Sequence, residues 1–175
     1  MVMPPGLRKF ALTLHMVTSV GWLGAVATFL ALAIAGLGGR DAGMTRAAYL
    51  SMDTVAWYVI VPLSFASPLT GLVQSLGTPW GLFRQYWVLL KLLMTIPSTL
   101  LLLVHMGPID YTAGIAAKTG LSGADLHGMR MQLVIEASAA LFVLLTATVL
   151  SVYKPKGMTR YGWRKQNMER SIAQP

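Results

Sequence analysis

The sequence predicts an all-α protein in which four helices cross a membrane as a bundle. Of its 175 residues, 55% are hydrophobic and only 11% are charged, whereas soluble domains contain about 45–50% and about 25%. Four long segments are almost free of charged residues, and each is long enough to cross the hydrocarbon, which takes about 20 residues in a helix. The length suits one domain. Together these features exclude an ordinary soluble domain.

The first predicted span covers residues 10–37. No Asp, Glu, Lys or Arg stands between Phe10 and Gly39. Arg8 and Lys9 precede this run, as basic residues do in a signal peptide, but the apolar region of a signal peptide has only about 7–15 residues. We therefore expect an uncleaved transmembrane helix.

The second predicted span covers residues 54–76, and Asp53 marks its start. Prolines interrupt the uncharged run to which it belongs. Because proline removes a backbone donor and cannot continue the regular hydrogen bonds of a helix, we expect kinks at Pro62 and Pro68 and a loop at Pro79.

The third and fourth predicted spans each contain one charged residue inside an apolar run. The third covers residues 86–106 and includes Lys91 and Pro97. The fourth covers residues 131–153 and includes Glu136. Residues 1–153 thus form one four-span domain, and residues 154–175 form a basic tail.

The positive charges are distributed unequally between the two ends of the predicted bundle. The N-terminal arm, the connection between spans two and three, and the tail hold Arg8, Lys9, Arg84, Lys154, Lys156, Arg160, Arg164, Lys165 and Arg170. The opposite end holds Arg40, Arg46, Lys118 and Arg130. By the positive-inside rule this pattern predicts a cytoplasmic-membrane protein with both termini in the cytoplasm.

Topology therefore explains most of the net charge of +8, and no nucleic-acid partner is expected. The tail carries Tyr161 and Trp163 among its cations, and we expect it to bind anionic lipid headgroups.

Several classes of chemistry are excluded by the residues available. The absence of cysteine rules out disulfides, thiolate metal sites, thioether-linked haem and a cysteine nucleophile. The three histidines are too widely separated to suggest a Ser-His-Asp triad. Glu136 is the one acid well inside a predicted span, so a pair of carboxylates for hydrolysis is not expected either.

His15 and Lys91 lie inside the predicted spans, where an ionisable side chain is costly and is therefore a candidate for function. Spans one and three run in the same direction, so the two residues are expected at similar depth near the cytoplasmic leaflet. The alternatives are that His15 only forms a hydrogen bond within the bundle and that Lys91 extends to the membrane interface.

Tryptophan and glycine residues accompany both candidates. Trp22 follows His15 by two helical turns, and Trp87 precedes Lys91 by about one, so each tryptophan shares a helical face with its ionisable partner. Gly21 and Gly24 flank Trp22 and would allow close approach of a neighbouring helix or of a flat ligand. The alternative for the tryptophans is a role in packing.

These residues resemble a motif of the HemJ-type protoporphyrinogen oxidases. The chain has Leu14-His15, six intervening residues and Trp22-Leu23-Gly24 in the first span, and Trp87-x-x-x-Lys91 in the third. The copper-resistance D-type proteins and an uncharacterised actinobacterial integral-membrane family are similar to the same degree. The segments 81–84 and 159–163 look most like the uncharacterised family. The resemblance covers about residues 8–153.

The resemblance implies a membrane protein that binds haem b through His15 and Lys91 and acts as an oxidoreductase on a tetrapyrrole or a quinone. Three ligand arrangements stay open: His15 with Lys91, His15 alone, and His105 with His127. The oxidase family usually has a further histidine toward the end of the first span, and the matching region 33–40 has none. This departure bears on the oxidase activity more than on haem binding.

A second group of polar residues is expected toward the other end of the bundle, and it comprises His105, His127, Asp53 and Glu136. The methionines Met44, Met52, Met106, Met129 and Met131 fall on the same side. Thioethers with imidazole suit copper, whereas imidazole with carboxylate suits zinc or iron. His127 and Glu136 fall on opposite faces of one helix and are not expected to share an ion. Glu136 could serve a proton path or pair with Arg130, and the pair is the preferred expectation.

Two further functions remain open from the sequence. One is a copper-handling or metal-transport protein that uses this second group of His and Met residues. The other is a non-catalytic accessory subunit, in which the small residues Ala137, Ser138, Ala139 and Ala140 pack against a partner subunit or a second copy of the chain.

Overall fold

The computed structural model describes residues 3–39, 41–77, 81–118, 124–155 and 157–173, and in these residues it confirms the predicted all-α fold. The elements are α1 (Pro5–Gly38), α2 (Ala42–Val55), the π-helical turn η1 (Ala56–Ile60), α3 (Val61–Leu76), α4 (Tyr86–Lys118), α5 (Ala124–Tyr153) and α6 (Arg160–Ala173). Four helical segments are long and apolar enough to cross a membrane: α1, the continuous segment α2–η1–α3, α4 and α5. The chain is therefore a multi-pass membrane protein.

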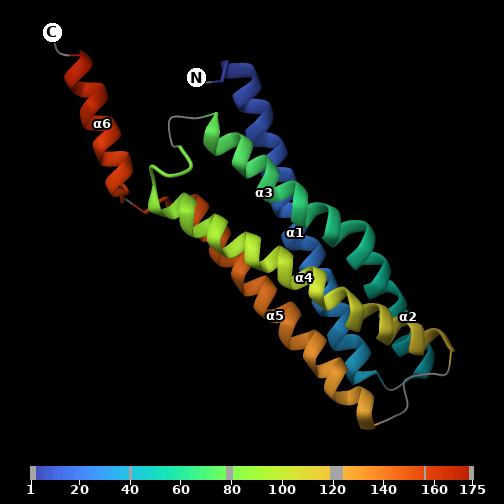
Figure 1. Cartoon of the computed structure of the whole chain (residues 1–175). Helices are drawn as coiled ribbons and strands as arrows, with labels where there is room; N and C mark the ends of the chain where they lie inside the picture. The colour runs from blue at the N-terminus through green and yellow to red at the C-terminus, as the bar shows by residue number, and fades with distance from the viewer. Residues whose placement is uncertain (1–2, 40, 78–80, 119–123, 156, 174–175) are drawn as a thin grey trace.

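The four spanning segments form a bundle in which consecutive segments are neighbours (Figure 1). Helix α1 packs against α2, α3 and α5, and α4 packs against the same three elements, so α1 and α4 lie diagonally across the bundle. This is the up-down-up-down arrangement typical of helices joined by short loops. The chain ends lie toward the same end of the bundle. We call this the proximal end and the opposite one the distal end.

The helices extend beyond the spans expected from charge alone, mainly at the distal end. Helix α2 begins at Ala42, because the Asp41 side chain caps it by accepting a hydrogen bond from the Met44 N–H at 2.8 Å. Asp53 therefore lies inside α2, which corrects the expectation that it opens a span. Helix α4 likewise continues to Lys118. Charged residues limit the hydrocarbon-spanning part of a helix but do not end the helix itself.

A change in helix type precedes the first proline of α3. The π-helical turn η1 directly precedes Val61-Pro62, and such a turn accommodates the hydrogen bond that proline cannot make. Pro68 lies within α3. Pro79, Arg40 and Lys156 lie outside the described residues.

Exposed tyrosine and tryptophan side chains mark two levels along the bundle. Tyr86 and Tyr153 lie at the proximal level, and Trp57, Tyr58 and Tyr111 at the distal level. The separation of the two tyrosines on α4 corresponds to about 38 Å at about 1.5 Å per residue. Aromatic residues concentrate at both membrane interfaces, which lie a similar distance apart. We therefore place the hydrocarbon between these two levels.

The C-terminal tail is fixed to the connection between α3 and α4. Thr159 donates its N–H to the Arg84 carbonyl at 3.0 Å and its hydroxyl to the Phe83 carbonyl, while Tyr86 donates its N–H to the Gly157 carbonyl at 3.3 Å. The Thr159 hydroxyl also accepts the Gly162 N–H at 3.0 Å, which caps α6. Beyond this contact α6 extends away from the bundle (Figure 1).

Candidate functional site

His15 lies in the seam between α1 and α3, inside the hydrocarbon. Its Nδ1 is 3.1 Å from the Ser67 carbonyl oxygen and 3.2 Å from the Thr70 hydroxyl. A carbonyl only accepts hydrogen bonds, so Nδ1 carries a proton and donates it. The Thr70 hydroxyl uses its own proton on the Ala66 carbonyl at 2.7 Å and accepts from the ring. In the neutral imidazole the lone pair is therefore on Nε2.

The imidazole ring of His15 packs against Gly71 of α3. A Cβ atom at position 71 would lie 3.0 Å from Cε1 and 3.4 Å from Nδ1 of His15, which is closer than atoms normally approach. The imidazole thus packs on a helix surface without a side chain. Among the hydrogen bonds of the described residues, none involves Nε2 of His15.

Hydroxyl groups continue the polar seam between α1 and α3. Ser19 and Ser67 share a hydrogen bond of 2.8 Å between their hydroxyls, and the hydroxyls of Thr18 and Thr70 are 3.2 Å apart. Because polar side chains in hydrocarbon have no water as an alternative partner, such pairs fix how two helices align. These hydroxyl pairs between α1 and α3 therefore help to fix the depth and rotation of His15, together with its own hydrogen bonds.

The Lys91 side chain bonds to α5 and not to His15. Its Nζ donates to the hydroxyl of Ser151 on α5, which in turn donates to the Ala147 carbonyl at 2.9 Å. Ser151 lies close to Tyr153 at the proximal level, as expected if the lysine extends toward the interface. Lys91 and His15 come from diagonal helices, and no hydrogen bond of the described residues joins them, although they lie within range of a Coulomb interaction.

Of the tryptophans and glycines in the predicted motif, Trp22 and Gly21 contribute to packing. Trp22 is only 3% exposed and belongs to the bundle core. A Cβ at Gly21 would lie 3.2 Å from Cδ1 of Leu63, so this glycine allows α3 to approach α1. Gly24 is exposed, with no atom near the Cβ position, and Trp87 is half-buried.

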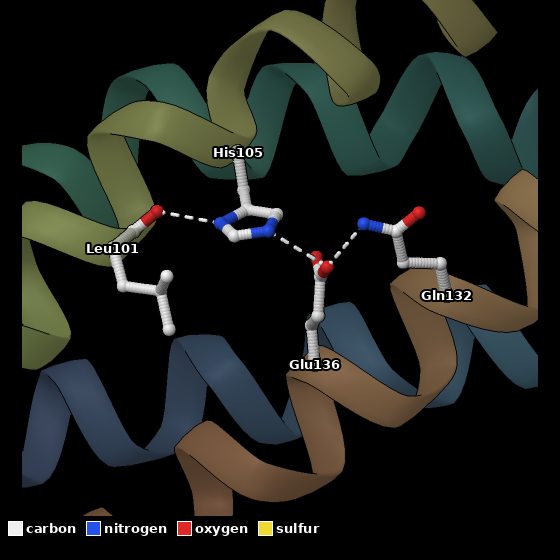
Figure 2. A network of polar contacts seen from close by, with 4 residues as sticks. All are labelled: Leu101, His105, Gln132 and Glu136. Carbon is white, nitrogen blue, oxygen red and sulfur yellow. Dashed lines mark hydrogen bonds and ion pairs between the residues drawn. The ribbon is translucent and has the colours of Figure 1, made fainter.

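Toward the distal end, His105 and Glu136 form a contact between α4 and α5 (Figure 2). The His105 Nε2 is 2.7 Å from the Glu136 Oε1, and its Nδ1 is 2.7 Å from the Leu101 carbonyl. Gln132 donates its amide to the same Oε1 at 2.6 Å. The sequence placed both residues in one group of candidate metal ligands, but it did not predict that they contact each other or that His105 lies well inside α4.

The expected pair of Glu136 with Arg130 is wrong. The Arg130 guanidinium donates to the Tyr49 hydroxyl at 2.9 Å and to the carbonyls of Gly36 and Leu37. These carbonyls end α1 and lack hydrogen-bond partners within the helix. They therefore bind the Arg130 cation in place of the Glu136 carboxylate. Arg130 thereby joins α5 to α1 and α2 at the distal end of the bundle.

The other expected metal ligands are spread over several places. Asp53 lies against Asp110, which accepts the Trp57 indole N–H at 2.8 Å, and His127 is exposed near the start of α5. Two of the four predicted ligands, His105 and Glu136, are thus brought together. Within the part of the chain that the structure describes, no three His, Asp or Glu side chains gather as they would to hold a metal ion.

The methionines are also divided between the core and the surface. Met52 and Met106 are buried in the core, whereas Met44 and Met131 are exposed. The structure therefore does not gather these thioethers around the histidines.

A scan against protein-family models and searches of curated proteins and of solved structures found no match to this chain.

Proposed function

We propose that this chain is a small membrane protein that binds haem b, with His15 as the axial ligand. The observation that carries the proposal is the anchored imidazole: the Ser67 carbonyl holds the Nδ1 proton at 3.1 Å, and the lone pair is left on Nε2. Haem-ligating and metal-ligating histidines are held in this way, because the second-shell bond fixes the tautomer and the ring orientation. An anchored ligand inside hydrocarbon also suits a flat, largely apolar cofactor.

The residues fit one axial ligand better than two. The Nε2 of His15 makes no hydrogen bond among the described residues, whereas the Lys91 ammonium is already bonded to Ser151. We therefore assign to Lys91 the role of a cationic partner for a haem propionate near the proximal interface. A haem at this position would supply one-electron redox chemistry, and the protein would set its orientation and polarity.

The resemblance of the His15 and Lys91 motifs to the HemJ-type oxidases extends the proposal to an oxidoreductase activity on a tetrapyrrole or a quinone. Both substrates are hydrophobic and reach a membrane-embedded site through the lipid. The anchored histidine supports the haem part of this proposal, and the resemblance alone supports the substrate.

The visible spectrum of the purified protein tests haem binding. The wild-type protein is expressed in haem-replete cells and extracted in mild detergent, and oxidised and reduced spectra are recorded with a pyridine haemochrome assay. We expect a b-type spectrum, with bands that shift on reduction. Colourless protein under these conditions would contradict the proposal.

We also propose that the proximal end faces the cytoplasm and that the tail binds anionic headgroups there. The cations of the tail and of the α3–α4 connection support this orientation by the positive-inside rule, and Tyr161 and Trp163 on α6 are exposed. Reporter fusions after residue 173 and within the connection near residue 120 should report opposite sides of the membrane. The same side for both fusions would contradict the four-span topology, and a periplasmic residue 173 would reverse the orientation.

A further inference from the structure

The contact between His105 and Glu136 requires a specific number of protons. The Leu101 carbonyl accepts from Nδ1 of His105 at 2.7 Å, so Nδ1 is protonated. A carboxylate also only accepts, so the 2.7 Å contact between Nε2 and Oε1 needs a second proton. That proton lies either on Nε2, giving an imidazolium–carboxylate pair, or on Glu136, giving a carboxylic acid that donates to the ring.

Either arrangement holds one proton more than a neutral histidine beside an ionised glutamate. With that proton removed, a carboxylate oxygen would face the lone pair of Nε2 at hydrogen-bond distance, which is repulsive. The observed geometry therefore belongs to the pair with the additional proton bound. Gln132 supports both arrangements, because its amide donates to Oε1 at 2.6 Å whichever atom carries the proton.

The pair lies within the membrane, near the distal interface. Along α4, His105 precedes the distal aromatic level at Tyr111 by about 9 Å, at about 1.5 Å per residue. The side chains of His105 and Glu136 are 20% and 25% exposed. Gln132, one turn nearer the distal end of α5, is exposed. The distal interface is therefore the nearest place from which water can deliver a proton to the pair.

None of the hydrogen bonds described in the structure joins a neighbouring charged group to this pair; Arg46 of α2 and His127 of α5 are exposed, and Oδ1 of Asp53 has no hydrogen-bond partner. On α4, Asp110 accepts from Trp57 of η1 and lies against Asp53 of α2. On α5, Arg130 bonds to the end of α1 and to Tyr49 of α2. The helices α1 and α3 contribute no Asp, Glu, Lys or Arg at this level. His105 and Glu136 therefore exchange the proton with each other and with water.

We propose that His105 and Glu136 form a proton-binding site within the membrane, which binds one proton from the distal side and couples its occupancy to the contact between α4 and α5. Release sends one H⁺ to water and removes the hydrogen bond that joins the two helices. The site is separate from His15 and does not depend on haem binding.

Ring ¹⁵N NMR of the histidine-labelled full-length protein, with the His105 signals assigned by their loss in His105→Gln, tests the proton count directly. At neutral pH we expect a protonated Nδ1. We further expect either a protonated Nε2 or an infrared carboxylic-acid band that disappears in Glu136→Gln. A neutral His105 beside an ionised Glu136, whichever ring nitrogen carries the proton, would overturn the proposal, because that pair lacks the additional proton.

Thermal unfolding at several pH values tests the coupling to the helix contact. Glu136→Gln is the informative variant, because an amide N–H can donate to Nε2 without binding a proton. We expect the unfolding midpoint of the wild type to be lower by at least about 3 °C, relative to this variant, at a pH high enough to remove the shared proton. The control Ser138→Ala, which alters an exposed hydroxyl on the same helix, should follow the wild type. Equal pH dependence of wild type and Glu136→Gln would refute the coupling.

Discussion

Replacing Gly36 by alanine is expected to lower the free energy of unfolding by about 1–3 kcal/mol, as overpacking of a buried contact typically does. A Cβ at this position would lie 2.7 Å from Cε2 and 2.9 Å from Cζ of the Tyr49 ring. The ring has little room to move, because Tyr49 is 1% exposed and its hydroxyl is held by Arg130 at 2.9 Å. The added methyl group therefore disturbs the contact that closes the distal end of the bundle.

Gly24→Ala is the matched control for this prediction. Gly24 lies in the same helix, and nothing lies within 4 Å of its Cβ position. Alanine there should leave the stability unchanged or raise it by up to about 1 kcal/mol, because glycine is unfavourable inside a helix. Thermal or denaturant unfolding in detergent measures both variants. Equal changes in the two would show that the Tyr49 contact is not the cause.

Replacing Gly162 by alanine is expected to release the tail from the connection between α3 and α4. A Cβ at Gly162 would lie 2.5 Å from the carbonyl oxygen and 3.0 Å from the Cα of Arg84. These are backbone atoms, which cannot move aside as a flexible side chain can. The clash is therefore expected to break the bonds that Thr159 makes with Phe83 and Arg84.

Limited digestion with trypsin measures this release, because Arg160 and Arg164 lie in the tail. We expect cleavage to accelerate by about tenfold or more, since about 1.4 kcal/mol of lost docking free energy raises the released population tenfold. Gly157→Ala is the control, because its Cβ would make an ordinary contact of 3.5 Å with Tyr86. Unchanged cleavage of Gly162→Ala would contradict the docked arrangement.

The number of spans could be predicted from the sequence because the hydrocarbon excludes charge so strongly. The helix ends could not. Asp53 and Asp110 are tolerated inside helices at the distal end, where Asp110 finds the Trp57 indole, and nothing local to either residue shows that the helix continues. The cap at Asp41 was the available signal for the start of α2.

His15 could be predicted as a candidate site residue because an ionisable side chain is costly in hydrocarbon. Its hydrogen-bond partners could not be predicted. Ser67 and Thr70 resemble any hydroxyl residues that bond to their own helix, and only the packing of α3 on α1 turns them toward the imidazole. A weak signal existed, since Ser67, Thr70 and Gly71 share one face of a helix and form a small, polar stripe.

The partner of Glu136 could not be predicted from proximity in the sequence. Arg130 is near Glu136 along one helix, whereas His105 is on another helix and its rotation cannot be known without the α4–α5 contact. The long Arg130 side chain instead reaches the carbonyls that end α1. Which of two partners a charged group selects depends on tertiary geometry.

The most direct test of the central claim is the haem content per chain of His15→Ala compared with that of His127→Ala. His127 is exposed, so its replacement controls for the loss of a histidine without altering the α1–α3 seam. We predict that His15→Ala inserts in the membrane but loses the b-type pigment, while His127→Ala retains it at the wild-type level. Wild-type pigment in His15→Ala would contradict the assignment of His15 as the axial ligand.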